Sequence, residues 1–120
     1  MAKYVDGFVV PVPRSKLDDY KKMARKASKL WLEHGALEVR ECVAEDVKTG
    51  KLTSFPQSVD RKRNETVAFS WIVYRSRAQR DKVNAKVMAD PRLAAMGTME
   101  DMPFDGKRMI YGGFKVSVDL

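Results

Sequence analysis

The sequence predicts an α+β domain with a ferredoxin-like fold, whose elements follow the order β-α-β-β-α-β. A repeated segment is the first observation that predicts it. Residues 8–16 align with residues 69–77 at Phe, Val, Arg, Ser and a basic residue, and both copies precede a helical pattern and then a strand pattern. The length of 120 residues is the second observation, because it suits a single domain spanning 1–120 with one core.

The first strand is predicted over about 4–12, and Ser15 is a suitable N-cap for the helix that follows. Residues on one side of this helix recur at spacings of three and four, which places them on an arc of about 100°. They are Leu17, Tyr20, Ala24, Ala27, Trp31 and His34. Gly35 supplies the left-handed residue that ends the helix.

The second strand is predicted over 36 to about 47, and its many charges suit a sheet edge. Alternation places two sets of side chains on its opposite faces: Leu37, Val39, Glu41 and Val43 on one, and Glu38, Arg40, Cys42 and Ala44 on the other. Residues 52–59 are predicted as a short irregular strand that Pro56 interrupts.

The third strand, over 66–74, is apolar enough to be central in the sheet. Ser76 caps a second helix that runs to about Ala89, and a short helical turn is predicted over 92–96. The last strand is predicted over 109–119. Its Gly112-Gly113 pair indicates a bulge or a close backbone approach.

Right-handed crossovers place both helices on one side of the sheet. Aligning the two copies assigns six strand residues to the side that meets the helices: Phe8, Val10, Val12, Phe69, Trp71 and Val73. The other side then carries Val5, Val9, Pro11, Ala68, Ser70, Ile72, Tyr74, Tyr111, Lys115 and Ser117. Since this side is too apolar to stay in water, we expect a second copy, related by a two-fold axis, to cover it.

The net charge of +7 raises the question of a nucleic-acid partner. Six lysines and arginines lie on the outer arc of the first helix, which is typical of a solvated face. The outward face of the first strand has no aromatic residue on which bases would stack, so nucleic-acid binding is not expected. No apolar run is long enough for a bilayer, and the first residues do not form a signal core, so a cytoplasmic protein without a membrane partner is expected.

Four polar or aromatic residues are predicted to line one cavity between helices and sheet: Asp6, His34, Trp71 and Asn84. In a catalytic hypothesis, His34 removes a proton from a phenolic or enolic substrate, Asn84 binds the oxyanion, and Trp71 packs on the ring. In the structural interpretation, which we favour, His34 only stabilises the end of its helix. Tyr20 and Trp31, on the same helical arc, are further candidates for ligand contact, and buried Asp6 needs a partner such as Arg40 or Arg80.

Metal and cofactor sites are not predicted. One histidine and one cysteine, Cys42, in separate elements give no ligand spacing, and the single cysteine excludes an internal disulfide and indicates a packing residue. The glycines lack the spacing of a phosphate-binding loop.

Eight segments give the chain a resemblance to the bacterial YbaA-like family: 4–13 (YVDGFVVPVP), 33–38 (EHGALE), 41–46 (ECVAED), 53–57 (TSFPQ), 69–77 (FSWIVYRSR), 88–92 (MADPR), 102–109 (MPFDGKRM) and 112–115 (GGFK). The resemblance implies a dimeric α/β barrel, in which two ferredoxin-like sheets face each other with the helices outside. It implies no activity, because that family has no known function. The wider superfamily with this barrel includes cofactor-free monooxygenases, haem-degrading enzymes and small-molecule isomerases, which share the fold and not a site.

The sequence therefore predicts a homodimer that binds a small apolar or aromatic molecule between sheet and helices, without a cofactor. A cofactor-free monooxygenase or isomerase is the alternative. An RNA-binding protein and a purely structural or interaction protein are more distant alternatives.

Overall fold

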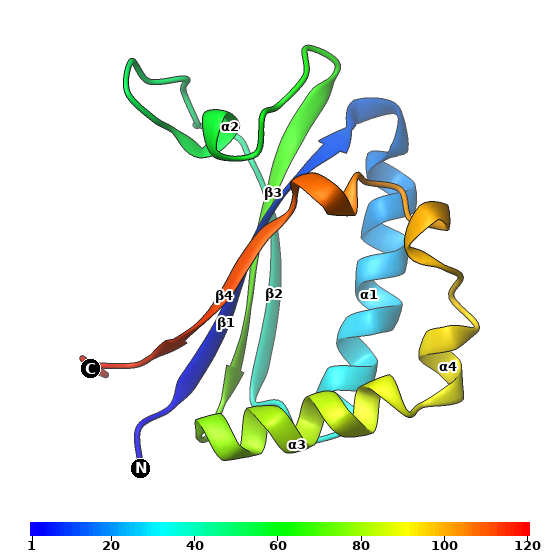
Figure 1. The fold of residues 1–120 in the computed structure, drawn as a ribbon, viewed down its shortest axis with the longest axis vertical. Helices are drawn as coiled ribbons and strands as arrows, with labels where there is room; N and C mark the ends of the chain where they lie inside the picture. The colour runs from blue at the N-terminus through cyan, green and yellow to red at the C-terminus, as the bar shows by residue number, and fades with distance from the viewer.

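The computed structural model describes residues 1–120 and contains one antiparallel four-stranded sheet in the order β2-β3-β1-β4. The strands are β1 (Tyr4–Pro13), β2 (Glu38–Val43), β3 (Glu65–Tyr74) and β4 (Ile110–Lys115). The two long helices, α1 (Leu17–Glu33) and α3 (Arg77–Met88), lie on one side of the sheet (Figure 1). The predicted ferredoxin-like α+β fold is confirmed, with β2 at an edge and β3 in the centre.

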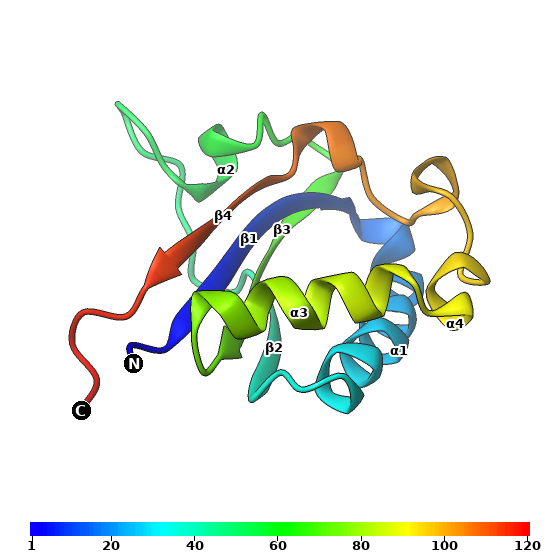
Figure 2. The ribbon, with the colours of Figure 1, turned by 60° about the horizontal axis from the view of Figure 1, so that its bottom comes forward.

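Short helical segments occupy several of the connections. They are the helical turns α2 (Phe55–Ser58) and α4 (Pro91–Ala94) and the 3₁₀ turns Arg14–Lys16, Met99–Asp101 and Gly106–Arg108. The α2 turn lies on the side of the sheet away from α1 and α3 (Figure 2). No helix of the chain is both long and apolar enough to span a bilayer.

The prediction of a strand over 52–59 is wrong, because this segment contains the α2 turn. Ser54 is its N-cap, with Oγ accepting a hydrogen bond from the Gln57 amide at 3.3 Å. Pro56 lies in the first turn of α2, where a helix does not need the missing amide hydrogen. Pro56, which was predicted to interrupt a strand, is therefore equally compatible with the start of a short helix.

The two Arg-Ser pairs behave differently. Ser76 caps α3, accepting a hydrogen bond from the Gln79 amide at 3.1 Å, as predicted. Ser15 does not cap α1, because Arg14–Lys16 forms a 3₁₀ turn that takes the place of a capping side chain at the helix start. Consequently α1 begins at Leu17 and α3 at Arg77, so the two helices start 60 residues apart while the Arg-Ser pairs are 61 apart.

The register in which the strands pair makes the predicted faces of β3 and β4 wrong. Phe8 of β1 lies opposite Ser70 of β3, and residues paired across an antiparallel ladder point to the same face. The helix-facing side of β3 therefore carries Thr66, Ala68, Ser70, Ile72 and Tyr74, whereas Phe69, Trp71 and Val73 point to the other side. Side chains alternate along a strand, so aligning β3 with β1 at an offset of 61 and not 60 assigns every β3 side chain to the wrong face.

The predicted face of β4 is also reversed. Tyr111 pairs with Phe8 and its ring stacks on the Phe8 ring at 6.3 Å, so it points to the helices. Gly113, two residues on, pairs with Asp6, and a Cβ there would lie 2.5 Å from the Tyr4 hydroxyl. The predicted close approach is therefore to a tyrosine side chain.

The core between sheet and helices consists of two clusters. One joins Val10, Val12 and Ala68 of the central strands to Tyr20 and Ala24 of α1. The other joins the sheet and the connection between α1 and β2 to α3, through Ala36, Ile72, Tyr74, Val83 and Val87. Burial of these side chains contributes the main free energy that holds α1 and α3 against the sheet.

The opposite side of the sheet is only partly covered. The segment containing α2 packs on one end of it, where Val59 forms a small buried cluster with Val9 and Val67. Beyond this end, the outward side carries large apolar side chains, of which Phe69, Phe114 and Ile110 are 40%, 66% and 45% exposed. We call this surface the outer sheet face and define it by Val5, Phe69, Trp71, Val73, Ile110 and Phe114.

Candidate functional site

A cavity of about 190 Å³ lies between α1 and the helix-facing side of the sheet. We call it the apolar cavity, because eleven of its fourteen lining residues are hydrophobic. Helix α1 contributes Tyr20, Met23, Ala24, Ala27, Ser28 and Trp31; the sheet contributes Phe8, Val10, Val39, Glu41, Ser70 and Ile72; the loop before β4 contributes Phe104 and Met109. Four of the six residues on the predicted arc of α1 thus line the cavity, namely Tyr20, Ala24, Ala27 and Trp31, whereas Leu17 and His34 do not.

One hydrogen-bonded pair provides the main polar feature of this cavity. The Tyr20 hydroxyl donates to Glu41 Oε2 at 2.7 Å, and Oε1 of the same carboxylate accepts no hydrogen bond within the chain. Burial, and then the Glu41 carboxylate, raise the pKa of Tyr20 above its ordinary value. Tyr20 therefore remains protonated and continues to donate its hydrogen bond to Glu41.

The pKa of Glu41 is also shifted. Burial of the carboxylate against the cavity wall raises it, and the Tyr20 hydrogen bond opposes this effect by favouring the ionised form. Glu41 was not predicted as a site residue. Its signal was present in the sequence, since alternation along β2 places it on the same face as Val39, which meets the helices.

A second pocket, of about 230 Å³, lies between α3 and strands β1 and β4. We call it the polar pocket. It is lined by Asp6, Phe8, Trp31, Arg80, Asn84, Met88, Tyr111, Gly112 and Gly113. Phe8 and Trp31 line both this pocket and the apolar cavity, so the two spaces adjoin at these aromatic rings.

Asp6 is buried at the base of the polar pocket and forms an ion pair with α3. Arg80 Nη1 lies 2.7 Å from Asp6 Oδ1, and the guanidinium also lies over the Tyr4 ring, 4.9 Å from its centroid. Of the two partners considered from the sequence, Arg80 is the correct one, whereas Arg40 pairs with Glu38 on the other face. The ion pair satisfies a carboxylate whose burial would otherwise be costly.

Asn84 joins three elements beside this pair. Its Oδ1 accepts hydrogen bonds from the Trp31 indole of α1 at 3.0 Å and from the Tyr74 hydroxyl of β3 at 3.3 Å. Burial, followed by the nearby Asp6 carboxylate, raises the pKa of Tyr74 above its ordinary value, so this hydroxyl remains a donor. The predicted inward position of Asn84 on its helix thus places it at the polar pocket.

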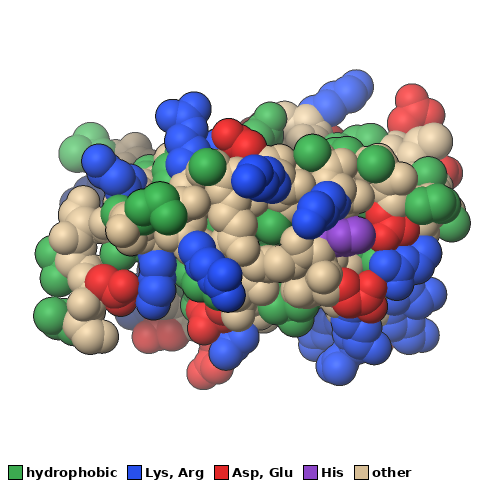
Figure 3. Space-filling view, turned by 90° about the horizontal axis from the view of Figure 1, so that it is seen from below, with side chains coloured by type: hydrophobic (Ala, Val, Ile, Leu, Met, Phe, Trp, Pro, Cys, Tyr) green, Lys and Arg blue, Asp and Glu red, His purple; other side chains and the backbone are tan.

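His34 lies away from both spaces. Its Nε2 is 2.8 Å from Asp90 Oδ2, in front of α4, and Asp90 also pairs with Arg92. The histidine is visible at the surface between acidic and basic side chains in Figure 3. His34 therefore binds the Asp90 carboxylate at the end of its helix and does not line the apolar cavity.

Replacing His34 by alanine is expected to lower Tm by a few degrees and to leave the apolar cavity unchanged, so that the affinity of a one-ring aromatic probe for it should be the same before and after the change. The change removes the bond that ties the end of α1 to the start of α4, and it removes nothing from the cavity walls. Thermal unfolding and a binding titration on the same preparation measure both quantities. A large loss of binding at unchanged Tm would contradict this assignment.

Trp71 is also absent from the cavity. It belongs to the outer sheet face, where its indole N–H donates to Glu38 Oε2 at 2.8 Å and its ring lies 5.7 Å from that of Phe69. The structure therefore brings Tyr20 and Trp31 to the apolar cavity, and Asp6, Trp31 and Asn84 to the polar pocket. The catalytic arrangement of His34, Asn84 and Trp71 is not formed, because these residues lie at three separate places.

The chain contains no group of three or more His, Cys, Asp or Glu side chains placed to hold a metal ion. Cys42 is exposed on the edge strand, on the outward side, so the expectation that it packs inside the protomer is wrong.

Comparison with solved structures supports the fold. A dimeric ferredoxin-like protein from an uncultured marine organism superposes with a TM-score of 0.58 at 12% identity, and all of both chains is covered. A nipsnap family protein of unknown function from Agrobacterium tumefaciens superposes with a TM-score of 0.56 at 13% identity, covering 96% of this chain and 88% of the other. At this identity the similarity shows a shared fold and not a shared activity.

Sequence comparison shows the family. The uncharacterised protein YbaA of Escherichia coli K12 is 56% identical over 117 residues, which is 98% of each chain, and its Shigella flexneri counterpart is equally similar. The model of a family described as protein of unknown function (DUF1428) matches residues 3–106. The chain is therefore a member of the DUF1428 family, as its resemblance to YbaA-like proteins predicts.

Proposed function

We propose that this protein binds a small apolar or aromatic molecule in the apolar cavity between α1 and the sheet. One observation carries the proposal: a partly open space of about 190 Å³ remains between α1 and the sheet, with mainly hydrophobic walls and the Tyr20–Glu41 pair on one side. Interiors of proteins are close-packed, and an unfilled apolar space costs stability. A binding role explains why such a space persists.

The dimensions and chemistry of the space limit the ligand. Pockets for drug-sized molecules are usually about 300–1,000 Å³, so this one suits a molecule with a single ring. The aromatic walls, Phe8 and Trp31 among them, favour stacking or edge contacts with such a ring. The proposal requires no metal and no cofactor.

The partner that we propose is a second copy of the chain, seated on the outer sheet face. Phe69 and Phe114 are large, apolar and exposed there, and Phe69 packs against Trp71 and Phe55 in a continuous aromatic surface. Exposed apolar surfaces of this kind mark association sites. The structural relative described as dimeric supports this partner. The apolar cavity lies on the other side of the sheet, so association leaves it free for a ligand.

The two tryptophans allow a direct test of binding. The variant Trp71→Phe leaves Trp31 as the only tryptophan, at the cavity wall, and Trp31→Phe leaves only Trp71, on the outer sheet face. Titration with nitrobenzene, a one-ring quencher of indole fluorescence, is expected to quench Trp31 along a saturating curve. The quenching of Trp71 should rise only linearly, through collisions. Linear quenching of both tryptophans would overturn the proposed site.

Filling the cavity is expected to abolish binding. In the Trp71→Phe background, Ala27→Phe places a ring in the space beside Trp31 and should weaken nitrobenzene binding more than tenfold, without a large loss of Tm, because the added side chain occupies an existing void. Ala85→Phe, at an exposed position of α3, is the matched control and should bind as the parent does. Equal binding by both variants would place the ligand elsewhere.

A further inference from the structure

We infer that the ligand carries a neutral hydrogen-bond acceptor, such as a ketone or aldehyde oxygen, which Asn84 binds in the polar pocket while the apolar part of the ligand fills the apolar cavity. This inference rests on the proposed function and adds the chemical class of the ligand. Its structural basis is that Phe8 and Trp31 line both spaces, so the proposed ligand has to extend past these two rings to occupy both.

The orientation of the Asn84 amide is fixed by its neighbours. An indole N–H can only donate a hydrogen bond, so the Asn84 atom 3.0 Å from Trp31 Nε1 must be the oxygen. The Tyr74 hydroxyl donates to the same oxygen. The Nδ2 group therefore points away from both partners.

This Nδ2 group is free to bind a ligand. It makes no hydrogen bond within the chain, whose bonds to Asn84 all involve Oδ1. Every fully buried side-chain nitrogen or oxygen of the chain has a hydrogen-bond partner. Since Nδ2 has none, it is not fully buried. Asn84 lines the polar pocket, and the inference takes this pocket as the space from which a ligand reaches Nδ2. An acceptor in the ligand satisfies this donor.

The charges around the pocket favour a neutral acceptor over a carboxylate. The Arg80 guanidinium is shared between Asp6 at 2.7 Å and Asp81 at 2.8 Å, so its positive charge is already compensated. An anionic ligand would add a negative charge beside Asp6 without an uncompensated cation among the lining residues. A carbonyl oxygen takes the Asn84 hydrogen without this repulsion.

Two ligands of similar shape test the inference. Acetophenone has a carbonyl where ethylbenzene has a methylene, and the affinities of both are measured by Trp31 quenching or competition with nitrobenzene in the Trp71→Phe background. The variant Asn84→Asp keeps the oxygen that Trp31 and Tyr74 require and replaces the NH₂ donor by an acceptor. It should weaken acetophenone about tenfold, the worth of one hydrogen bond, and leave ethylbenzene unchanged.

The other outcomes separate the two proposals. If both ligands bind and Asn84→Asp changes neither, or weakens both equally, the inference is wrong while the apolar cavity remains a binding site. If neither ligand binds the parent, and Ala27→Phe has no effect on nitrobenzene, the proposed function fails and the inference fails with it. Far-ultraviolet circular dichroism and Tm of Asn84→Asp verify that the variant is folded.

Discussion

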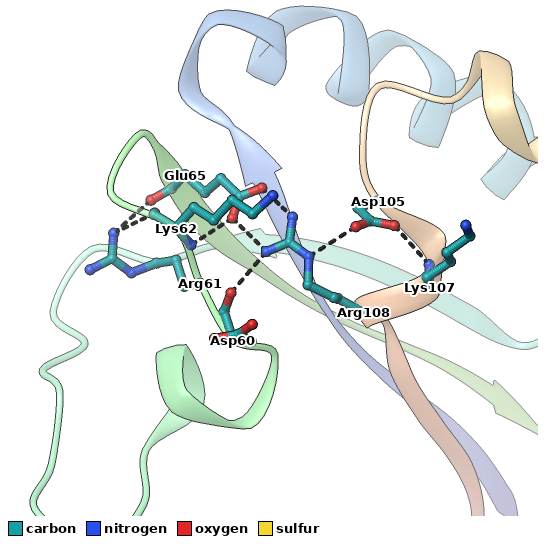
Figure 4. A network of polar contacts seen from close by, with 7 residues as sticks. All are labelled: Asp60, Arg61, Lys62, Glu65, Asp105, Lys107 and Arg108. Atoms are coloured by element: carbon teal, nitrogen blue, oxygen red, sulfur yellow. Dashed lines mark hydrogen bonds and ion pairs between the residues drawn. The ribbon is translucent and has the colours of Figure 1, made fainter.

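Arg108→Met is expected to lower the free energy of unfolding by about 3 kcal/mol, because it leaves a buried carboxylate without its cation. Arg108 Nη1 and Nη2 each lie 2.7 Å from an oxygen of Glu65, whose side chain is only 4% exposed. Arg108 also donates to the Asp60 carbonyl and to Asp105, as Figure 4 shows. In a chain of this length the loss corresponds to a fall in Tm of about 10 °C.

The pH dependence of the stability loss in Arg108→Met tests whether the unpaired Glu65 carboxylate causes it. The Arg108 hydrogen bonds hold the pKa of Glu65 below its ordinary value, so the pair contributes stability above the unfolded pKa near 4.5 and loses it as the pH falls through the folded pKa. In Arg108→Met, burial without a cation raises the pKa of Glu65 instead. The difference in stability between parent and variant should therefore be largest at neutral pH and shrink as the solution becomes acidic.

Two further variants make this test specific. Arg61→Met removes another arginine of the same network, one that binds the Glu65 backbone carbonyl and not its carboxylate, and should cost much less. The double variant Glu65→Gln with Arg108→Met removes the unpaired charge and should recover part of the loss. Urea unfolding at several pH values measures all four proteins. Equal losses in Arg61→Met and Arg108→Met would show that the buried carboxylate is not the cause.

Phe69→Lys is expected to convert the proposed dimer into single subunits of 13.7 kDa. The side chain stands in the aromatic surface of the outer sheet face, 5.7 Å from the rings of Phe55 and Trp71. A lysine there brings an ammonium from each copy into an apolar contact. This change should weaken association about a hundredfold or more, the effect expected of a central aromatic contact.

Leu32→Lys is the matched control. Leu32 is 46% exposed on α1 and lies outside the outer sheet face, so the same change there should leave association intact. Sedimentation equilibrium at micromolar concentration distinguishes the two masses. A parent protein that is already a single subunit at this concentration, or a Phe69→Lys variant that keeps twice the subunit mass, would contradict the proposed partner.

The order of elements and their positions in the sheet could be predicted because they follow from local periodicity. The arc of α1, the alternation along β2 and the apolar content of β3 each report on one element at a time. The face of β3 could not be predicted this way, because it depends on the register in which β3 pairs with β1, a strand distant in the chain.

The site was predictable only in part, because its contacts join residues that are distant in the chain. The spacing on α1 and α3 correctly indicated that Tyr20, Trp31 and Asn84 point inward. Their partners could not be predicted, because Trp31 and Asn84 are 53 residues apart in the chain and His34 and Asp90 are 56 apart. The last turn of α1 continues the same arc, but it meets α4 and not the sheet, so His34 binds a carboxylate there.

The close approach of Gly113 to Tyr4 limits which sequences this lineage can accept. A methyl group at position 113 would collide with the tyrosine ring, and the Arg80 guanidinium that lies over that ring holds Asp6. Even alanine, usually the mildest of mutations, would thus disturb a charge pair on another strand and helix.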